Sequence, residues 1–452
     1  MVVDDEAPPR PAVARDDRSA HAAFPSAPPG PPWSWRRLAT WALLLAAGGL
    51  YLSRRTAGVN AFDSVWAEDG ANFLNDAANN TIVEALTRPV NGYFLLYPRL
   101  LAEVTTRFPV DLWAFVNELL AMGSTLALAG IVYQASAGHL RRPVVRFLVA
   151  APVVLQWVAN GEAVNNVATL QFAMLYTLFW VLVSVPASRA GRVLAPAFAA
   201  LVSLSTVLAL ALVPLAVARA ASRRDRAGIA MLAALLVGVA VQIIPYATGL
   251  TGRHGIGETK PDPGWVLTRF VDLQVPAAFL GEKITPTLPD SPRLVVLVWA
   301  GVVLVVAVGF WRRLEPAWVL AALAIGNALA IFAAEAVAMG SVPDRYLVAP
   351  MLLLVSTVVA VLRPRAAPPG PRPRVVAFAP VAVFAALMMV VAFANYRVEY
   401  PRRTLWVKSW TAQVSAGAAQ CRAEPARRTV VVLSGKYYMP YARVTIPCRR
   451  LR

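Results

Sequence analysis

A succession of apolar runs separated by short polar segments constrains the fold of this chain more than any other feature. An α-helix needs roughly 20 mostly apolar residues to cross the hydrocarbon core of a bilayer. The chain is 58% hydrophobic and only 15% charged, which is too apolar for an ordinary soluble domain. We therefore predict an all-α polytopic membrane protein. The runs are Leu38–Leu52, Leu112–Gln134, Pro143–Ala159, Thr169–Val185, Val193–Val217, Ile229–Tyr246, Leu294–Trp311, Ala317–Met339, Tyr346–Leu362 and Val375–Asn395.

The formal net charge of +18 comes from arginines that cluster between the apolar runs. Clusters in that position are typical of loops that stay in the cytoplasm. No basic stripe alternates with aromatic residues on a polar surface, so the charge does not indicate nucleic-acid binding. The basic clusters therefore serve as markers of topology.

Residues 1–33 are rich in Pro, Ala and charge, and we expect a disordered cytoplasmic tail there. The first run, Leu38–Leu52, follows Arg36 and Arg37 and resembles a signal-anchor more than a cleaved signal peptide. This order places the N-terminus in the cytoplasm.

Parity decides how the runs cross the membrane. With one pass per run, the basic loops at Arg141 and Arg189 cannot lie on the same side as the loop at Arg223. Either 91–107 also spans the bilayer, or the run Val193–Val217 is a hairpin that turns near Ser203. We prefer the hairpin because 91–107 would bring Arg99, Glu103 and Arg107 into the membrane at high cost.

The hairpin gives about eleven passes in the inner (plasma) membrane, with the C-terminus outside. The transmembrane domain is then 34–395, with outer loops at 54–111 and 249–291, and residues 396–452 form a small extracytoplasmic domain. That domain contains a predicted strand, Thr429–Leu433. It also holds the only two cysteines, Cys421 and Cys448, for which a single disulfide is possible.

The first outer loop carries the most distinctive polar residues, Glu68 and Asp69 before Gly70, followed by two predicted juxtamembrane helices. Adjacent carboxylates before a glycine can supply a general base, a ligand for a divalent cation, or charge at a helix N-terminus. Tyr93 and Arg99 follow in the same loop and are candidates for substrate contacts. Residue types alone favour the helix N-terminus.

Polar residues at bilayer depth also occur in the other outer loops. Glu162, Asn165 and Asn166 can hydrogen-bond sugar hydroxyls or satisfy exposed helix ends. Arg345 and Tyr346 at the start of a late pass can hold a phosphate, or Arg345 can pair with Asp344.

The remaining signals are weaker. We expect Glu335, inside a late pass, to face the bundle interior or a cavity. The glycines and prolines of 249–291 indicate a mobile cover, in which His254 is a candidate substrate contact and, more simply, a solvated loop residue. With His21 and His139, the histidines are too scattered for a metal cluster. No phosphate-binding loop, dinucleotide fingerprint, nucleophile elbow or zinc-protease motif occurs.

The residues Trp66-Ala67-Glu68-Asp69-Gly70, the juxtamembrane helices after them and Arg345-Tyr346 resemble the GT-C class of membrane glycosyltransferases. A longer pattern, which adds Gly92-Tyr93, Pro98-Arg99-Leu100 and the run 165–171, is similar to uncharacterised actinobacterial GT-C-like proteins. The likeness in architecture covers most of 60–395. The C-terminal domain is smaller than in many members, and no second acidic pair is obvious.

The resemblance implies transfer of a sugar from a polyprenyl-phosphate donor to an envelope glycan or lipid acceptor on the extracytoplasmic face. It implies Asp69 as general base with Glu68 as its neighbour, and Arg345 as the ligand of the donor phosphate. No cofactor is certain, although Glu68 and Asp69 would hold Mg²⁺ or Mn²⁺ if the reaction uses a cation. Membrane lipid is an expected partner and nucleic acid is not.

Two other functions remain open at this point. A flippase or transporter for a lipid-linked saccharide needs a polar path, and the spans offer mainly Glu118, Asn327 and Glu335. A non-catalytic scaffold with the shape of a glycosyltransferase is the other alternative.

Overall fold

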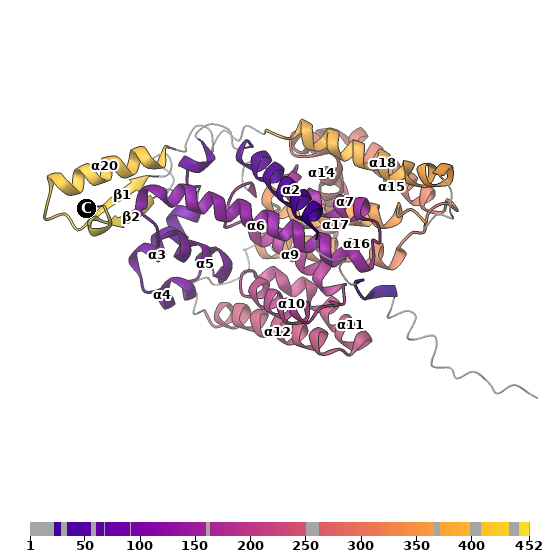
Figure 1. Ribbon diagram of the computed structural model, residues 1–452, viewed down its shortest axis with the longest axis horizontal. Helices are drawn as coiled ribbons and strands as arrows, with labels where there is room; N and C mark the ends of the chain where they lie inside the picture. Colours follow the sequence, from indigo (N-terminus) through magenta and orange to yellow (C-terminus); the bar gives the residue numbers. More distant parts are fainter. Residues whose placement is uncertain are drawn as a thin grey trace, which may run out of the picture.

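The computed structural model describes residues 22–28, 34–55, 60–66, 68–90, 92–159, 163–249, 262–365, 371–397, 408–433 and 443–451. Within these ranges the chain is mostly helical (Figure 1). Each predicted pass contains a helix, and the run Val193–Val217 contains parts of two. These helices are α2 (Trp35–Ser53), α6 (Trp113–Ala135), α7 (Pro143–Leu155), α9 (Leu170–Leu182), α10 (Arg189–Ser203), α11 (Val213–Arg223), α12 (Arg226–Ala247), α15 (Pro292–Gly309), α16 (Trp318–Met339), α17 (Val348–Val361) and α18 (Pro371–Ala394).

Six helical stretches are long and apolar enough to cross a bilayer, and α7 and α9 are shorter apolar helices. The prediction of an all-α polytopic membrane protein is confirmed, while the count of about eleven passes stays a prediction. The six stretches are Val110–Gly138, Arg226–Pro245, Pro292–Gly309, Trp318–Val337, Asp344–Val361 and Val376–Ala394.

Helices α9 and α17 form the centre of the bundle. Every residue of α9 is buried, as expected for a helix that is apolar all round. The Tyr176 hydroxyl on α9 donates to the Val149 carbonyl of α7 at 2.6 Å and lies 2.8 Å from Ser356 Oγ on α17. These bonds satisfy the polar group and join three helices in the core.

The run Val193–Val217 turns back on itself, as the charge argument favoured. The Val185 N–H, just before α10, donates to the Pro25 carbonyl, and Arg223 at the end of α11 donates to Ser26. At the other end, the Leu96 N–H donates to the Leu204 carbonyl, and the Tyr97 N–H donates to Ser205 Oγ. The two arms therefore begin and end at the same side of the bundle and turn at the opposite side.

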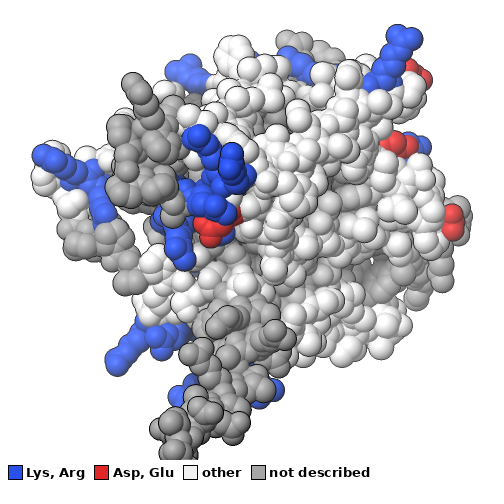
Figure 2. All heavy atoms as spheres, turned by 90° about the vertical axis from the view of Figure 1, so that its right-hand side faces the viewer, with Lys and Arg blue, Asp and Glu red and all other residues white. Residues whose placement is uncertain are grey.

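Loops that we predicted as cytoplasmic lie together at one end. Arg363 donates to the His139 carbonyl and pairs with Glu315, and Arg142 donates to the Arg365 carbonyl. Figure 2, which looks onto the right-hand side of Figure 1, shows Lys and Arg side chains gathered over this face, with few carboxylates. The loops that carry basic clusters in the sequence therefore lie together in the structure.

The first outer loop folds into short helices at the other end. The alternative that 91–107 spans the membrane does not apply, because this segment contains only a ten-residue helix, α5. The elements of the first outer loop are η2 (Ala61–Asp63), the π-helical turn η3 (Asp69–Leu74), α3 (Asn75–Asn79), α4 (Ile82–Thr87), α5 (Leu96–Thr105) and η4 (Val110–Leu112).

Residues 263–290 of the long outer loop form short helices, joined by a turn at 281–284, that pack on the bundle through Phe270 and Val275. Pro263, Pro276 and Pro286 stand in the first turns of these helices, where a missing N–H costs nothing. Residues 250–261 lie outside the described residues, and the expectation of a mobile cover stays a prediction. The elements are α13 (Pro263–Arg269), the π-helical turn η7 (Phe270–Gln274), α14 (Val275–Leu280), η8 (Thr285–Asp290) and, in the next outer loop, η9 (Asp344–Leu347).

The C-terminal domain consists of α20 (Trp410–Ala423) and an antiparallel pair, β1 (Thr429–Leu433) and β2 (Arg443–Pro447). A disulfide between Cys421 and Cys448 joins the end of α20 to the residue after β2. The predicted strand Thr429–Leu433 is confirmed. The domain lies beside the first outer loop, at the left of Figure 1.

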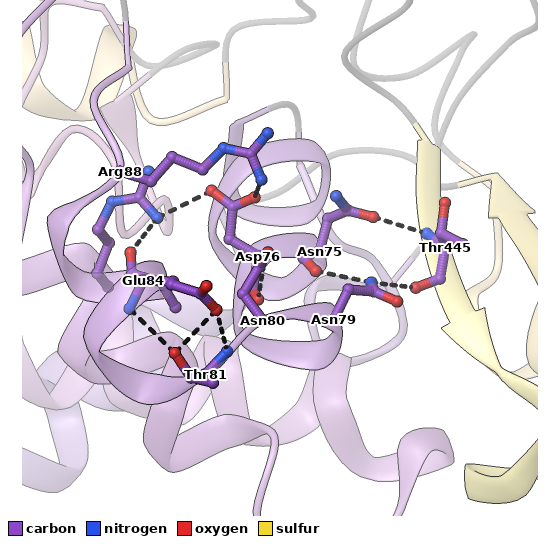
Figure 3. Close-up of polar contacts among 10 residues, drawn as sticks. Asn75, Asp76, Asn79, Asn80, Thr81, Glu84, Arg88 and Thr445 are labelled. Carbon is purple, nitrogen blue, oxygen red and sulfur yellow. Dashed lines mark hydrogen bonds and ion pairs between the residues drawn. The ribbon is translucent and has the colours of Figure 1, made fainter. Parts of the chain in front are cut away.

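Trp410 anchors this domain. The side chain is fully buried, its Nε1–H donates to the Val110 carbonyl at 2.7 Å, and its ring stacks on Trp113 with centroids 6.1 Å apart. On the other side, the Thr445 N–H donates to Asn75 Oδ1 and Asn79 donates to the Thr445 carbonyl (Figure 3). The domain is therefore tied to the short helix that follows η3.

We expect Trp410→Ala to lower the free energy of unfolding by about 3–5 kcal/mol, because it empties a large buried site and leaves a carbonyl without its donor. Ser415→Ala, at an exposed position on the same helix, is the matched control. Thermal unfolding and limited proteolysis of the full chain measure the effect. Equal protease resistance of the two variants would show that Trp410 does not anchor the domain.

Candidate active site

Asp69 joins three elements at the end of the bundle opposite the basic loops. Its side chain stands at the start of η3 and is only 1% exposed. Oδ1 accepts from the Ala168 N–H at 3.0 Å, while Oδ2 accepts from the Val167 N–H at 2.9 Å and from Asn117 Nδ2 at 3.1 Å. One carboxylate therefore fixes η3 to α6 and to the loop that leads into α9.

Burial raises the pKa of Asp69 to about 6, although the N–H groups of Val167 and Ala168 and the Asn117 amide favour the ionised form. The charge of the neighbouring Glu68 acts in the same direction as burial. Glu68 itself is half-buried and has no hydrogen bond in the described part of the chain. Of the two carboxylates, Glu68 is the one free to meet a ligand.

The loop before α9 is held by its own polar residues. Asn165 adopts a left-handed conformation, with φ of 54°, which asparagine tolerates better than most residues. Its amide donates to the Leu52 carbonyl at 2.9 Å, and Asn166 Oδ1 accepts from the Ala168 N–H at 2.8 Å. Both side chains are nearly buried. Both side chains therefore satisfy backbone groups, which is one of the two predicted roles, and contact with sugar hydroxyls stays a prediction.

Tyr93, Gln171, Arg345 and Tyr346 come from separate segments of the chain and lie near one another. The Tyr93 hydroxyl lies near enough to Gln171, Tyr346 and Arg345 to interact with them electrostatically, and burial raises its pKa above the ordinary value. The Arg345 guanidinium lies 5.4 Å from the centroid of the Tyr346 ring. The charges of Arg345 and Glu68 both act on Tyr93. Glu68, Tyr93, Arg345 and Tyr346 therefore form one cluster beside Asp69.

Arg99 lies elsewhere, and the role in substrate binding that we predicted does not fit its position. It is 1% exposed, donates to Asp76 at 2.9 Å and to the Ala85 carbonyl, and lies over the Phe73 ring. Asp76 also binds Arg88 at 3.0 Å (Figure 3). A substrate would have to displace a buried ion pair, so Arg99 holds α3, α4 and α5 together.

Glu162 and His254 fall outside the described residues. Two residues of the site escaped the sequence analysis, Asn117 and Gln171. The signal for Asn117 is a polar Asn-Glu pair inside the apolar run of α6, and Gln171 ends the 165–171 pattern quoted above.

A cation is not needed to explain the positions of the two carboxylates. Both oxygens of Asp69 already accept N–H groups, which a divalent ion would have to replace. The described ranges contain no group of three His, Cys, Asp or Glu that could hold a metal ion. A role for Mg²⁺ or Mn²⁺ stays a prediction.

No protein-family model matches the chain, and no curated protein matches its sequence. Among solved structures, it is similar to apo ArnT from Cupriavidus metallidurans, with a TM-score of 0.43 and 14% identity over 86% of this chain and 70% of ArnT. For ArnT bound to undecaprenyl phosphate the TM-score is 0.41 and the identity 15%, over 86% of this chain and 72% of ArnT. Likeness this distant assigns no function.

The raised pKa of Asp69 predicts a pH dependence of stability. Since the folded-state pKa of about 6 exceeds the value of 3.8 for a free carboxyl, protonation favours the folded state. The contribution is complete below about pH 3.8 and is lost as the pH rises through about 6, by about 3 kcal/mol. Chemical unfolding from pH 3.5 to 7 should show this loss in the wild type and not in Asp69→Asn. Parallel profiles would contradict it.

Proposed function

We propose that the protein transfers a sugar from a polyprenyl-phosphate donor to an envelope glycan or lipid acceptor at the extracytoplasmic face of the membrane. The observation that carries the proposal is the cluster of Glu68, Tyr93, Arg345 and Tyr346 beside the buried Asp69, at the end of the bundle opposite the basic loops. A carboxylate, an arginine and hydroxyl groups at this depth suit a lipid phosphate and a sugar.

The reaction needs one base and one site for an anionic leaving group. The carboxylate takes the proton of an acceptor hydroxyl as its oxygen bonds to the anomeric carbon of the donor sugar. The bond from that carbon to the phosphate oxygen breaks, and the polyprenyl phosphate leaves with the electron pair. Arg345 neutralises the charge that develops on the phosphate.

Within this proposal, the geometry favours Glu68 as the base and Asp69 as a positioning residue. The family resemblance implied the opposite assignment, with Asp69 as the base and Glu68 as its neighbour. Asp69 is buried and accepts three N–H groups, whereas Glu68 is half-buried and interacts electrostatically with Tyr93. A base must lie within reach of the proton that it removes.

Glu68→Gln and Asp69→Asn test this division. We expect Glu68→Gln to lower kcat by about 10²- to 10⁴-fold with an unchanged unfolding temperature, since only the proton acceptor is lost. Asp69→Asn should lower both kcat and the unfolding temperature, because the new amide NH₂ group would face an N–H group that donates to the carboxylate in the wild type. The measurement is transfer of radiolabelled sugar from a panel of polyprenyl-phosphate hexoses and pentoses to envelope glycan fragments, beside thermal unfolding.

Several outcomes would count against the proposal. Full activity of Glu68→Gln with loss in a stable Asp69→Asn would return the role of base to Asp69. No transfer from any donor by the wild type, despite measurable donor binding, would favour a transporter or a scaffold over an enzyme.

Arg345→Ala should lower kcat/KM for the donor by about 10- to 100-fold, because it removes a charge-assisted contact to the phosphate. The KM of the acceptor should not change. Arg293→Ala, at an exposed outer arginine at the start of α15, is the matched control. An effect on the acceptor KM instead of the donor would place the phosphate elsewhere.

A further inference from the structure

Glu335 is a buried carboxyl group that has no hydrogen-bond partner among the residues that the structure describes. It stands near the outer end of α16, is 1% exposed, and neither of its oxygens has a hydrogen bond in the described part of the chain. Burial of a carboxylate without a partner is costly, and more so inside a membrane. A ligand that donates hydrogen bonds would remove this cost.

The position of Glu335 connects it to the candidate active site. Helix α16 packs along α17 (Figure 1) and against η9, which carries Arg345 and Tyr346. The Tyr346 hydroxyl interacts electrostatically with Glu335 and also with Arg345 and Tyr93. Glu335 therefore lies next to the cluster and is more deeply buried than Arg345.

Gln274 provides a second, independent observation at the same place. Its side chain is fully buried, and its Nε2 donates to the carbonyl of Leu347, the residue after Tyr346. Its Oε1 is buried and has no partner among the described residues. The rings of Phe270 and Phe332, one turn before Gln274 and Glu335, are 5.5 Å apart. Helix α16 and the π-helical turn η7 thus place acceptor oxygens that have no partner in the described ranges next to η9.

We propose that Glu335 binds the sugar of the donor by accepting hydrogen bonds from two neighbouring hydroxyl groups, with Gln274 Oε1 as a further acceptor. This inference rests on the proposed function and assigns a residue that decides which sugar is used. The unsatisfied atoms are all acceptors, so the group that fits them is a donor such as a hydroxyl. A phosphate is an acceptor too and would be repelled, which leaves it to Arg345.

The test combines substitutions with deoxy donors, using the full chain in lipid nanodiscs. The wild type is assayed with the polyprenyl-phosphate sugar that it transfers and with derivatives that lack one hydroxyl each. Removal of a hydroxyl bound by Glu335 should lower kcat/KM by about 100-fold or more in the wild type. In Glu335→Ala the same removal should cost less than about threefold, because the contact is already absent.

Asn327→Ala is the matched control. Asn327 is another nearly buried polar residue of α16, and its amide donates to the Leu323 carbonyl of its own helix. This variant should discriminate among the deoxy donors as the wild type does. Glu335→Gln should show a weakened preference, since one acceptor oxygen remains.

The outcomes separate this inference from the proposed function. If the wild type transfers sugar and Glu335→Ala keeps its full discrimination, Glu335 does not bind the sugar although the enzyme is established. If the wild type transfers no sugar from any donor, the proposed function is wrong, and the inference that rests on it is wrong with it. Thermal unfolding addresses the case of a purely structural role, in which Glu335→Gln would lower the unfolding temperature. We expect an equal or higher temperature, because an unsatisfied buried charge is removed.

Discussion

The carboxylate of Asp69 is the contact on which the outer end of the molecule depends. It accepts hydrogen bonds from the backbone before α9 and from Asn117 on α6, and it begins η3. Without these bonds, the buried Val167 N–H would lose its acceptor, the Ala168 N–H would keep only Asn166 Oδ1, and the loop would no longer be fixed to the first outer loop. This arrangement fixes the relative positions of Glu68 and Gln171. Glu68 directly precedes Asp69, and Gln171 stands three residues after Ala168, whose N–H donates to Asp69.

The C-terminal domain extends the same support outward. Asn75, the first residue after η3, accepts from the Thr445 N–H, so β2 is bonded to the helix that continues from the acidic pair. Trp410 and the disulfide between Cys421 and Cys448 fix the domain at its other side. A small domain with two short strands has little core of its own, and its order follows from these contacts.

Hydropathy and charge were sufficient to predict the helices and the hairpin, because burial in a bilayer and the placement of arginines act over whole segments. Individual side chains were harder to predict. Arg99 was predicted as a substrate contact, yet it forms a buried ion pair with Asp76, 23 positions earlier in the chain. Asn165 and Asn166 looked like sugar contacts, yet they satisfy backbone groups nearby. Each of these pairings depends on a tertiary contact that spacing along the chain does not reveal.

The same comparison separates polar residues that hold the fold from those that await a ligand. Asp76, Asp69 and Asp225 are each bonded to donors of the chain, and each joins two or more segments. Glu335 has no such donor in the described ranges, although it is as deeply buried as Asp69. Selection for stability alone would replace such a group with an apolar one, since an unpaired carboxyl lowers stability without joining anything. Its presence next to the Tyr346 cluster is therefore best explained by a contact that forms only when substrate is bound.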